Sequence, residues 1–288
     1  MNFLYKIPGY MLLLFGGFCL SWGGLIIRQF QEVGVWEILF LRSIFFLIAL
    51  VFFLFITYKK NTFKIIKDSG FPAVIGGLFL SLSFIAYVFS ITTTSVANVV
   101  FIISTQTIFL AIFGYFILRE KISLFGFFSI ILAMIGIGIM VGDSISSGSF
   151  IGNIVALAIP INFSILVMII RKYPRLDMIP AILYSGILSC FYGFFLSDSL
   201  NFSSHDIFMG FLLGVPQLAF GFICITIGSR TTPSTTIGLL MLTETLFGPI
   251  WVWLFLNEIP PISVFIGGGI IVAAVIFKTL EQKRSIAS

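Results

Sequence analysis

Residues 105–120 read TQTIFLAIFGYFILRE, and a related segment, TETLFGPIWVWLFLNE, occupies residues 243–258. Both begin with Thr-x-Thr, continue through an apolar run and end in a glutamate. The same offset of 138 positions aligns residues 76–123 with residues 214–261 at about a dozen identical positions. Weak internal similarity of this kind is typical of membrane proteins that are built from two structural repeats. The pair of segments therefore predicts a duplicated helical fold.

The composition indicates an integral membrane protein. Of the 288 residues, 59% are hydrophobic and 9% are charged, and the mean hydropathy is +1.17, far from the usage of soluble domains. The basic residues lie in short segments between apolar runs, a pattern of membrane topology rather than of nucleic-acid binding. The three cysteines lie singly in apolar runs, so we interpret them as inert thiols (Cys19, Cys190, Cys224). Only one histidine is present to complete a metal site, and we therefore expect no disulfide, metal site or cofactor.

About ten apolar runs are long enough to cross a bilayer, since a spanning helix needs about 20 residues. Their continuous character excludes the alternating strands of a membrane barrel. The sequence therefore predicts an all-α membrane protein with ten transmembrane helices, over residues 10–28, 36–58, 70–91, 96–118, 122–142, 149–170, 177–197, 206–229, 233–256 and 260–280.

The basic residues predict the orientation. With ten spans, 14 of the 16 Lys and Arg residues fall on one side, which the positive-inside rule makes cytoplasmic. We therefore expect a multi-pass protein of the cell (inner) membrane with both termini in the cytoplasm. The two exceptions are Arg28 and Arg42, which lie at or inside the membrane. The residues on the predicted cytoplasmic side are Lys6, Lys59, Lys60, Lys64, Lys67, Arg119, Lys121, Arg171, Lys172, Arg175, Arg230, Lys278, Lys283 and Arg284.

The repeat and the topology together predict two inverted halves, residues 1–143 and 144–288. Five helices per half is an odd number, so the second half must enter the membrane from the opposite side. Inverted halves can supply two packings of similar energy around a site near the midplane, one open to each face. This is the pattern expected of a carrier.

The chain resembles the EamA-type carriers of the drug/metabolite transporter superfamily over nearly its whole length. The resemblance rests on SWGG (21–24), FLRSIFFLIAL (40–50), TTTSVANVVFI (92–102) and LREKISLFGFFSIILAMIGIGIMV (118–141), with a weaker copy beginning LNEIPPISV (256–264). It implies helices 1, 3, 4, 6, 8 and 9 around a central cavity. It also implies small metabolites as cargo, from amino acids and sugars to nucleotide conjugates and amines.

Glu244 is the strongest candidate for chemistry, because it lies near the middle of its apolar run. A carboxylate at that depth is costly and should face the bundle interior or a wet cavity. Thr243 and Thr245 flank it, and Pro249 would leave the carbonyl of Thr245 without its helical donor. Glu244 could bind a cationic part of a substrate, carry a proton that couples transport, or act only as a structural link between helices.

Other polar residues extend the candidate substrate path. Gln106 is the counterpart of Glu244 in the first half, and Asn98 precedes it by two helical turns. Arg42 is always charged and could pair with a carboxylate of the chain or of a substrate. Asn162 and Gln217 each lie near a proline that should break the helix. Neighbouring helices or a cavity would have to satisfy the backbone groups that such a break leaves free.

Three aromatic residues are candidate cavity walls: Trp22, Tyr87 and Trp251. Trp251 lies seven residues after Glu244, so both should project to nearly the same face of their helix. Aromatic walls favour planar or cationic substrates. Packing or interface anchoring is the better explanation of each aromatic residue when it is taken singly.

These features favour a secondary transporter of a small organic metabolite, such as an amino acid, an amine or a related zwitterion or cation. Alternating access with proton coupling through Glu244 is one mechanism. A proton-independent facilitator or exchanger of metabolites such as nucleoside-like compounds is the other, and a channel would need charge rings or repeated carbonyl filters that are not visible. Enzyme motifs are absent from the sequence. We expect a monomer or weak homodimer, with the bilayer and a small-molecule substrate as partners.

Overall fold

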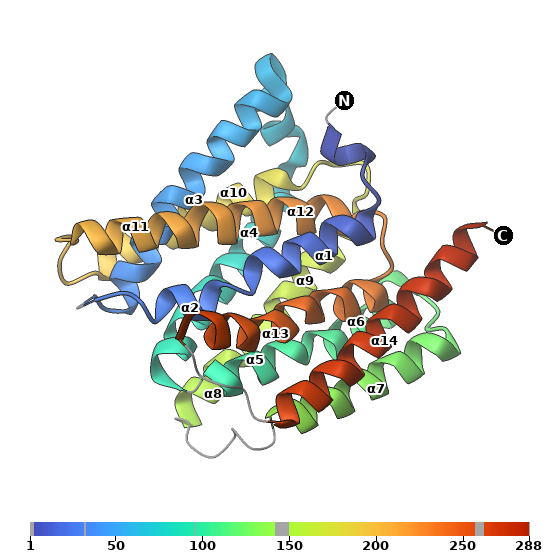
Figure 1. Cartoon of the computed structure of the whole chain (residues 1–288). Helices are drawn as coiled ribbons and strands as arrows, with labels where there is room; N and C mark the ends of the chain where they lie inside the picture. The colour runs from blue at the N-terminus through green and yellow to red at the C-terminus, as the bar shows by residue number, and fades with distance from the viewer. Residues whose placement is uncertain (1–2, 32, 95, 142–149, 257–261, 288) are drawn as a thin grey trace.

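The regular structure of the protein is helical throughout the residues described by a computed structural model, which are 3–31, 33–94, 96–141, 150–256 and 262–287 (Figure 1). The segments are η1 (Phe3–Lys6), α1 (Gly9–Leu20), α2 (Gly23–Ile27), α3 (Val35–Tyr58), η2 (Lys59–Asn61), α4 (Thr62–Thr93), α5 (Val96–Ser104), α6 (Gln106–Leu118), α7 (Leu124–Val141), α8 (Phe150–Ala156), α9 (Ala158–Lys172), α10 (Ile179–Leu196), α11 (Ser204–Leu212), the π-helix η4 (Leu213–Ala219), α12 (Phe220–Ser229), α13 (Ser234–Leu256) and α14 (Ile262–Ala287).

Each predicted apolar run is mainly helical over its described residues, and residues 142, 149, 260 and 261 at the ends of three runs lie outside the described residues. Within the described residues, six stretches are long and apolar enough to cross a membrane, and the helical parts Leu124–Ile139 and Phe265–Phe277 are apolar but shorter. The prediction of an all-helical, multi-span membrane protein is therefore confirmed. The six stretches are Gly9–Ile27, Val35–Thr93, Asn98–Leu118, Phe150–Lys172, Ile179–Leu196 and Ser204–Ser229.

The long helix α4 contains a break at Gly70. Its backbone has φ 55° and ψ −155°, a left-handed conformation that glycine adopts without steric cost. Pro72 lies two positions later and cannot donate a helical hydrogen bond. The break separates a first segment that carries Lys64 and Lys67 from the apolar remainder, and it falls at residue 70, where the sequence predicts the start of a span.

Two further apolar runs are broken where helices cross near the middle of the molecule. The first run is divided into α1 and α2 at Ser21 and Trp22, and the eighth contains the π-helix η4 around Pro216. Gln217 of η4 donates from Nε2 to the carbonyl oxygen of Leu20, at 3.1 Å. A side chain at the second break thus provides a hydrogen bond to a backbone carbonyl at the first break. Backbone polar groups need such partners in an apolar environment.

The prolines expected to break helices have different effects. Pro160 lies in the first turn of α9, where a missing N–H is tolerated, and the break falls before it at Leu157. The helical assignment of α13 continues through Pro249, so a kink at this residue stays a prediction. An unpredicted break separates α5 from α6 at Thr105, whose hydroxyl bonds to the carbonyl oxygen of Ile102 at 2.6 Å.

The helices pack in matching pairs. Helix α1 lies against α12 and α13, while α9 lies against α4 and α6, and α6 and α13 contact each other. Helices α7 and α14 lie side by side at one edge of the bundle (Figure 1). A Cβ on Gly136 of α7 would lie 2.8 Å from the carbonyl oxygen of Gly267 in α14. These glycines permit close packing of α7 against α14.

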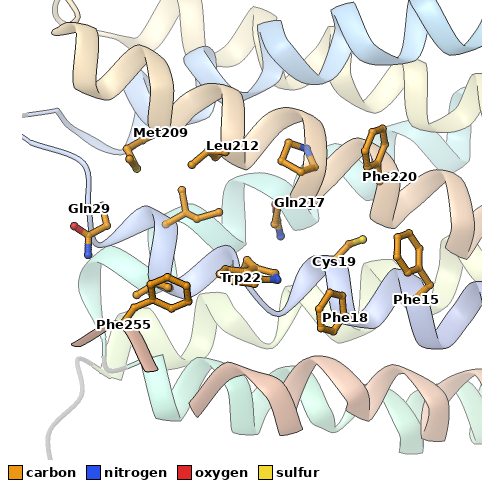
Figure 2. A pocket seen from close by; sticks show the side chains of 13 residues that line it. Phe15, Phe18, Cys19, Trp22, Gln29, Met209, Leu212, Gln217, Phe220 and Phe255 are labelled. Atoms are coloured by element: carbon orange, nitrogen blue, oxygen red, sulfur yellow. The ribbon is translucent and has the colours of Figure 1, made fainter. Parts of the chain in front are cut away.

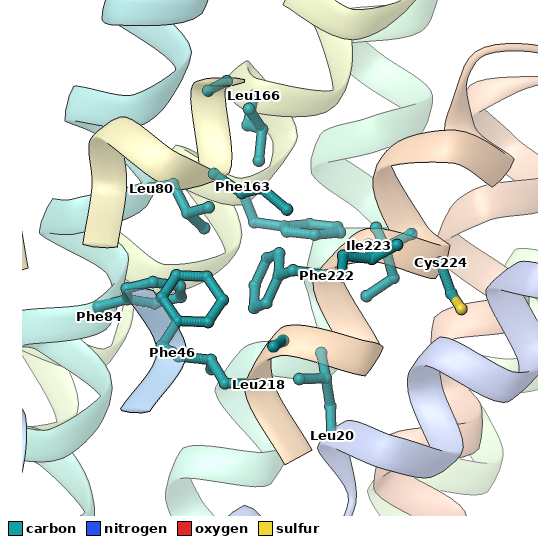
Figure 3. Close-up of a cluster of buried hydrophobic side chains, with 14 of the residues drawn as sticks. Leu20, Phe46, Leu80, Phe84, Phe163, Leu166, Leu218, Phe222, Ile223 and Cys224 are labelled. Carbon is teal, nitrogen blue, oxygen red and sulfur yellow. The ribbon is translucent and has the colours of Figure 1, made fainter. Parts of the chain in front are cut away.

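The core next to the crossing helices is aromatic (Figure 3). Phe84 of α4 contacts Phe46 and Phe222 edge to face, with ring centroids 5.7 and 5.2 Å apart, and Phe163 of α9 lies 6.5 Å from Phe222. Edge-to-face pairs fix ring orientation more than aliphatic contacts do. This cluster holds α3, α4, α9 and α12 together at the depth where the polar residues converge.

Candidate functional site

A cavity of about 50 Å³, the central cavity, lies where helical segments from both halves of the chain meet. Its apolar walls come mainly from the aromatic core, including Phe84, Phe163 and Phe222. Its polar lining is Arg42 of α3, Ser83 and Tyr87 of α4, Gln106 of α6, Gln217 of η4 and Glu244 of α13. Five residues singled out in the sequence therefore converge on one small space.

Arg42 is fully buried in the wall of the central cavity. Its Nη2 donates to the carbonyl oxygen of Phe84 at 2.9 Å, and its guanidinium carbon lies 5.0 Å from the centre of the Phe84 ring. Nε and Nη1 have no hydrogen-bond partner among the described residues. A buried guanidinium with two unused donors is costly unless an acceptor reaches it, and a planar carboxylate matches those donors well.

Glu244 lies on α13 and lines the same cavity without forming an ion pair with Arg42 in the described structure. Tyr87 lies close enough to interact electrostatically with both charged groups. A Cβ on Gly17 of α1 would lie 3.1 Å from Cβ of Thr243 and 3.5 Å from the amide nitrogen of Glu244. The glycine thus lets α1 approach α13 closely at the carboxylate.

The two glutamines complete the polar lining. Gln106 is buried at the start of α6, directly after the break at Thr105. Gln217 uses its amide nitrogen for Leu20, while its Oε1 has no partner in the part of the chain that the structure describes. A Cβ on Gly23 would lie 2.5 Å from Oη of Tyr87 and 2.9 Å from Nε2 of Gln217. Gly23 therefore lets the broken first helix fit against these two side chains.

A second cavity, the lateral cavity, is much larger and almost entirely apolar. It has a volume of about 680 Å³ and lies between α1–α2 and α11–α12, with Phe255 on a third side (Figure 2). Phe15 and Phe220 are each 50% exposed at its edge. Gln217 lines both cavities and marks where they adjoin. The other lining residues are Phe18, Cys19, Trp22, Leu25, Ile26, Gln29, Met209, Leu212 and Pro216.

Residues 7–142 match the model of the EamA-like transporter family. An uncharacterized transporter of Clostridium kluyveri is 26% identical over 297 aligned residues, which cover 96% of this chain and 94% of that protein. The first half of the chain therefore matches the EamA-like transporter family, and the similarity to a transporter extends over nearly the whole chain. A crystal structure of another protein has the same fold, with a TM-score of 0.77 at 15% identity over 96% of this transporter and 98% of that chain.

In this transporter, several predicted site residues lie away from the central cavity. The Thr243 hydroxyl donates to the carbonyl oxygen of Leu240 in its own helix, and Thr245 is buried. Asn98 donates from Nδ2 to Oγ1 of Thr94 at 3.5 Å. Asn162 is buried in α9 and lines neither cavity.

The two tryptophans predicted as cavity walls pack on each other. Trp22 and Trp251 stack with ring centroids 3.9 Å apart, and Nε1 of Trp251 donates to Oγ of Ser21 at 2.7 Å. Trp22 lines the lateral cavity instead of the central one. The pair braces the break between α1 and α2 against α13.

Sequence reasoning missed the apolar lining of the central cavity, although the repeat contained a signal for it. At the offset of 138 positions, lining residues of the two halves correspond in pairs: Leu80 with Leu218, Phe84 with Phe222, Ile103 with Met241, and Gln106 with Glu244. Shared Leu, Ile and Phe count for little in apolar helices, so only the polar pair was informative by itself.

The three cysteines of the transporter are free thiols, with Cys19 and Cys224 buried and Cys190 partly buried. Among the described residues, no group of three or more His, Cys, Asp or Glu side chains could hold a metal ion. The chemistry of the described site therefore rests on its charged, amide and hydroxyl groups.

Proposed function

We propose that this transporter is a secondary carrier of a small organic metabolite, with ten spans in two inverted repeats over residues 1–143 and 144–288. Both termini are cytoplasmic in this proposal, and the protein lies in the cell (inner) membrane. The observation that carries the proposal is the convergence of Arg42, Tyr87, Gln106, Gln217 and Glu244 on one intramembrane cavity. Ionisable residues at that depth are costly and mark substrate or ion pathways.

The packing supports the inverted repeat. Helix α4 contacts α9 as α12 contacts α1, and α6 contacts α9 as α13 contacts α1, so each contact has a counterpart in the other half. The central cavity is lined by four pairs of residues at the repeat offset, with Phe84 and Phe222 also in direct edge-to-face contact. The family match ends at residue 142, one position before the proposed boundary.

The charges favour a zwitterionic or cationic substrate, such as an amino acid or an amine. The unused donors of Arg42 fit a carboxylate, and the carboxylate of Glu244 fits an ammonium group. Tyr87 and the phenylalanines supply walls that suit an apolar or planar substituent. Glu244 can alternatively bind a proton when no cation occupies its place, which would couple transport to a pH gradient.

The size of the central cavity supports alternating access. Small-molecule sites usually enclose about 300–1,000 Å³. The volume of about 50 Å³ holds little more than a few water molecules, so a substrate requires the helices to move apart. A carrier that opens toward one face at a time accounts for this contraction, whereas an open channel would keep a continuous lumen.

The runner-up is a facilitator or exchanger that moves metabolites such as nucleoside-like compounds without protons. In that mechanism Glu244 only orients the substrate or holds helices together. The amide groups of Gln106 and Gln217 favour this alternative, because they hydrogen-bond neutral heteroatoms as well as charged groups.

The test begins with a panel of metabolites and purified protein. Ligands that bind the folded state raise its stability, by about 2.7 kcal/mol at 100 times the Kd, so thermal unfolding at two pH values identifies a substrate. Uptake of that compound into proteoliposomes is then compared between the unmodified protein and Glu244→Gln. The matched control is Glu37→Gln, since Glu37 is a buried acid that accepts a hydrogen bond from the amide of Asp198 at 2.8 Å.

Proton coupling predicts that Glu244→Gln loses accumulation driven by a pH gradient, whereas Glu37→Gln retains it. If Glu244→Gln accumulated the compound to the original level, proton coupling through Glu244 would be contradicted. The proton-independent facilitator or exchanger would then be the favoured mechanism. Absence of saturable uptake of any stabilising compound would contradict the carrier proposal itself.

A further inference from the structure

Four hydroxyl groups on α12 and α13 are buried without a hydrogen-bond partner in the described structure. One belongs to Thr236, and the other three belong to Thr226, Ser229 and Ser234, which are 1%, 0% and 0% exposed. An unsatisfied buried hydroxyl costs about 1–3 kcal/mol, and serine or threonine in a helix can usually bond to a carbonyl of the preceding turn. Water or a polar substrate would satisfy the hydroxyls of Thr226, Ser229 and Ser234 in an arrangement that exposes them.

These hydroxyls continue the helix faces that line the central cavity. On α12, Phe222, Thr226 and Ser229 follow at spacings of four and three residues, and Phe222 lines the cavity. Residues at these spacings share one face of a helix. The hydroxyls therefore extend the cavity wall toward the end of α12.

Helix α13 shows the same relation. Ser234, Ile237, Met241 and Glu244 follow at spacings of three, four and three residues, and the last two line the cavity. Ser234 lies about 15 Å from Glu244 along the axis, which is half the thickness of a bilayer core. A polar track thus runs from the cavity to the α12–α13 connection.

An ion pair closes this end of the track. Arg171 at the end of α9 pairs with Glu120, which follows α6. The other carboxylate oxygen of Glu120 accepts from the amide of Ser234 at 2.9 Å. Arg171 also donates to the carbonyl oxygens of Thr232 and Ser229. Glu120 and Arg171 side chains are 18% and 16% exposed, so the pair ties three connections together in a partly desolvated position.

We propose that the substrate passes between α12 and α13 along Thr226, Ser229 and Ser234, and that the Glu120–Arg171 pair must break to open this route. This inference rests on the proposed carrier function. In the opened arrangement the hydroxyls are hydrated or hydrogen-bond the substrate, which offsets the cost of separating the pair. Under the proposed topology this is the cytoplasmic route.

A second cluster on the same side of the molecule supplies a control. Tyr5 of η1 and Tyr58 at the end of α3 both donate to Oδ2 of Asp177, before α10. Burial and the neighbouring Asp177 raise the pKa of Tyr5, so its hydroxyl stays protonated and keeps this bond. The cluster ties η1, α3 and α10 together and contains no residue of the polar track.

The experiment measures access to Ser234→Cys in a protein whose Cys19, Cys190 and Cys224 are replaced by alanine. A membrane-impermeant maleimide is added to inside-out and right-side-out vesicles, and gel filtration in detergent verifies that each variant is folded. Ser229→Cys is a second reporter for the case in which Ser234→Cys fails to fold. Neither reporter requires a known substrate.

We expect Glu120→Gln to speed labelling of the reporter about tenfold from the inner face, because removing the pair shifts the population toward the open route. Tyr58→Phe should leave the rate unchanged. The exchanged pair Glu120→Arg with Arg171→Glu should label more slowly than Glu120→Gln.

Equal labelling with and without Glu120→Gln would overturn the proposal, as would equal acceleration by Tyr58→Phe, which indicates general loosening. Acceleration seen only from the opposite face would support the route and contradict the proposed orientation. Because labelling is independent of cargo, failure of the carrier proposal in uptake assays stays distinguishable from failure of this one.

Discussion

The two cavities of this EamA-like transporter contrast in volume and in charge: the larger one is apolar and the smaller one contains charged residues. The lateral cavity has a volume of about 680 Å³, yet its walls are aromatic and aliphatic. The central cavity has about 50 Å³, yet it contains Arg42 and Glu244. An apolar cavity buries no polar group and so costs little, whereas a buried charge without an ionic partner is expensive. We therefore propose the central cavity, which contains the buried charges, as the site of transport rather than the larger lateral cavity.

Arg42 provides the largest test of this difference. We expect Arg42→Met to lower transport of a carboxylate-bearing substrate by about 10- to 100-fold, because a hydrogen bond to a charged group contributes about 1.5–3 kcal/mol. Folding should be unaffected or stabilised, since an apolar side chain of similar size replaces a buried charge without an ionic partner. Uptake into proteoliposomes and thermal unfolding in detergent measure the two effects.

Arg28→Met is the matched control, because Arg28 is exposed at the end of α2 beside the lateral cavity. It should retain transport. If Arg28→Met lowered transport and Arg42→Met did not, the lateral cavity rather than the central cavity would be the site of transport.

Gly23 provides a smaller test of how the central cavity is built. A methyl group on Gly23 would meet Oη of Tyr87 at 2.5 Å, so Gly23→Ala should destabilise the protein by about 1–3 kcal/mol. Gly138→Ala is the control, because nothing lies within 4 Å of a Cβ at Gly138 and alanine favours helix by up to about 1 kcal/mol. Thermal unfolding in one detergent compares them, and equal stability of the two variants would show that the contact at Gly23 is not constraining.

Much of the fold could be predicted from the sequence, because apolar runs in a membrane have few alternatives to helix. The apolar run beginning at residue 70 coincides with a helix break at Gly70, where the backbone has a positive φ that glycine adopts without steric cost. The break at Thr105 could not be predicted, since Thr243, its counterpart at the repeat offset, lies inside an unbroken helix. That difference depends on tertiary packing rather than on local sequence.

The polar lining residues of the central cavity could be identified from the sequence, whereas the apolar ones could not. Arg42, Gln106 and Glu244 stand out because charge and amide groups are rare in these runs. Phe84 and Phe222 do not stand out among 36 phenylalanines, although both line the central cavity. Asn98 and Asn162 are polar and buried but bond or pack elsewhere, because depth alone does not fix which face of a helix a residue occupies.

Substrate protection of two single cysteines compares the cavities directly. One protein carries Met241→Cys in the central cavity and alanine at the native cysteines, and the other keeps only Cys19 in the lateral cavity. A small methanethiosulfonate reagent modifies each, with and without the compound that gives the largest stability shift. The account predicts that this compound slows modification of the central cysteine and leaves the rate at Cys19 unchanged; protection of Cys19 alone would contradict it.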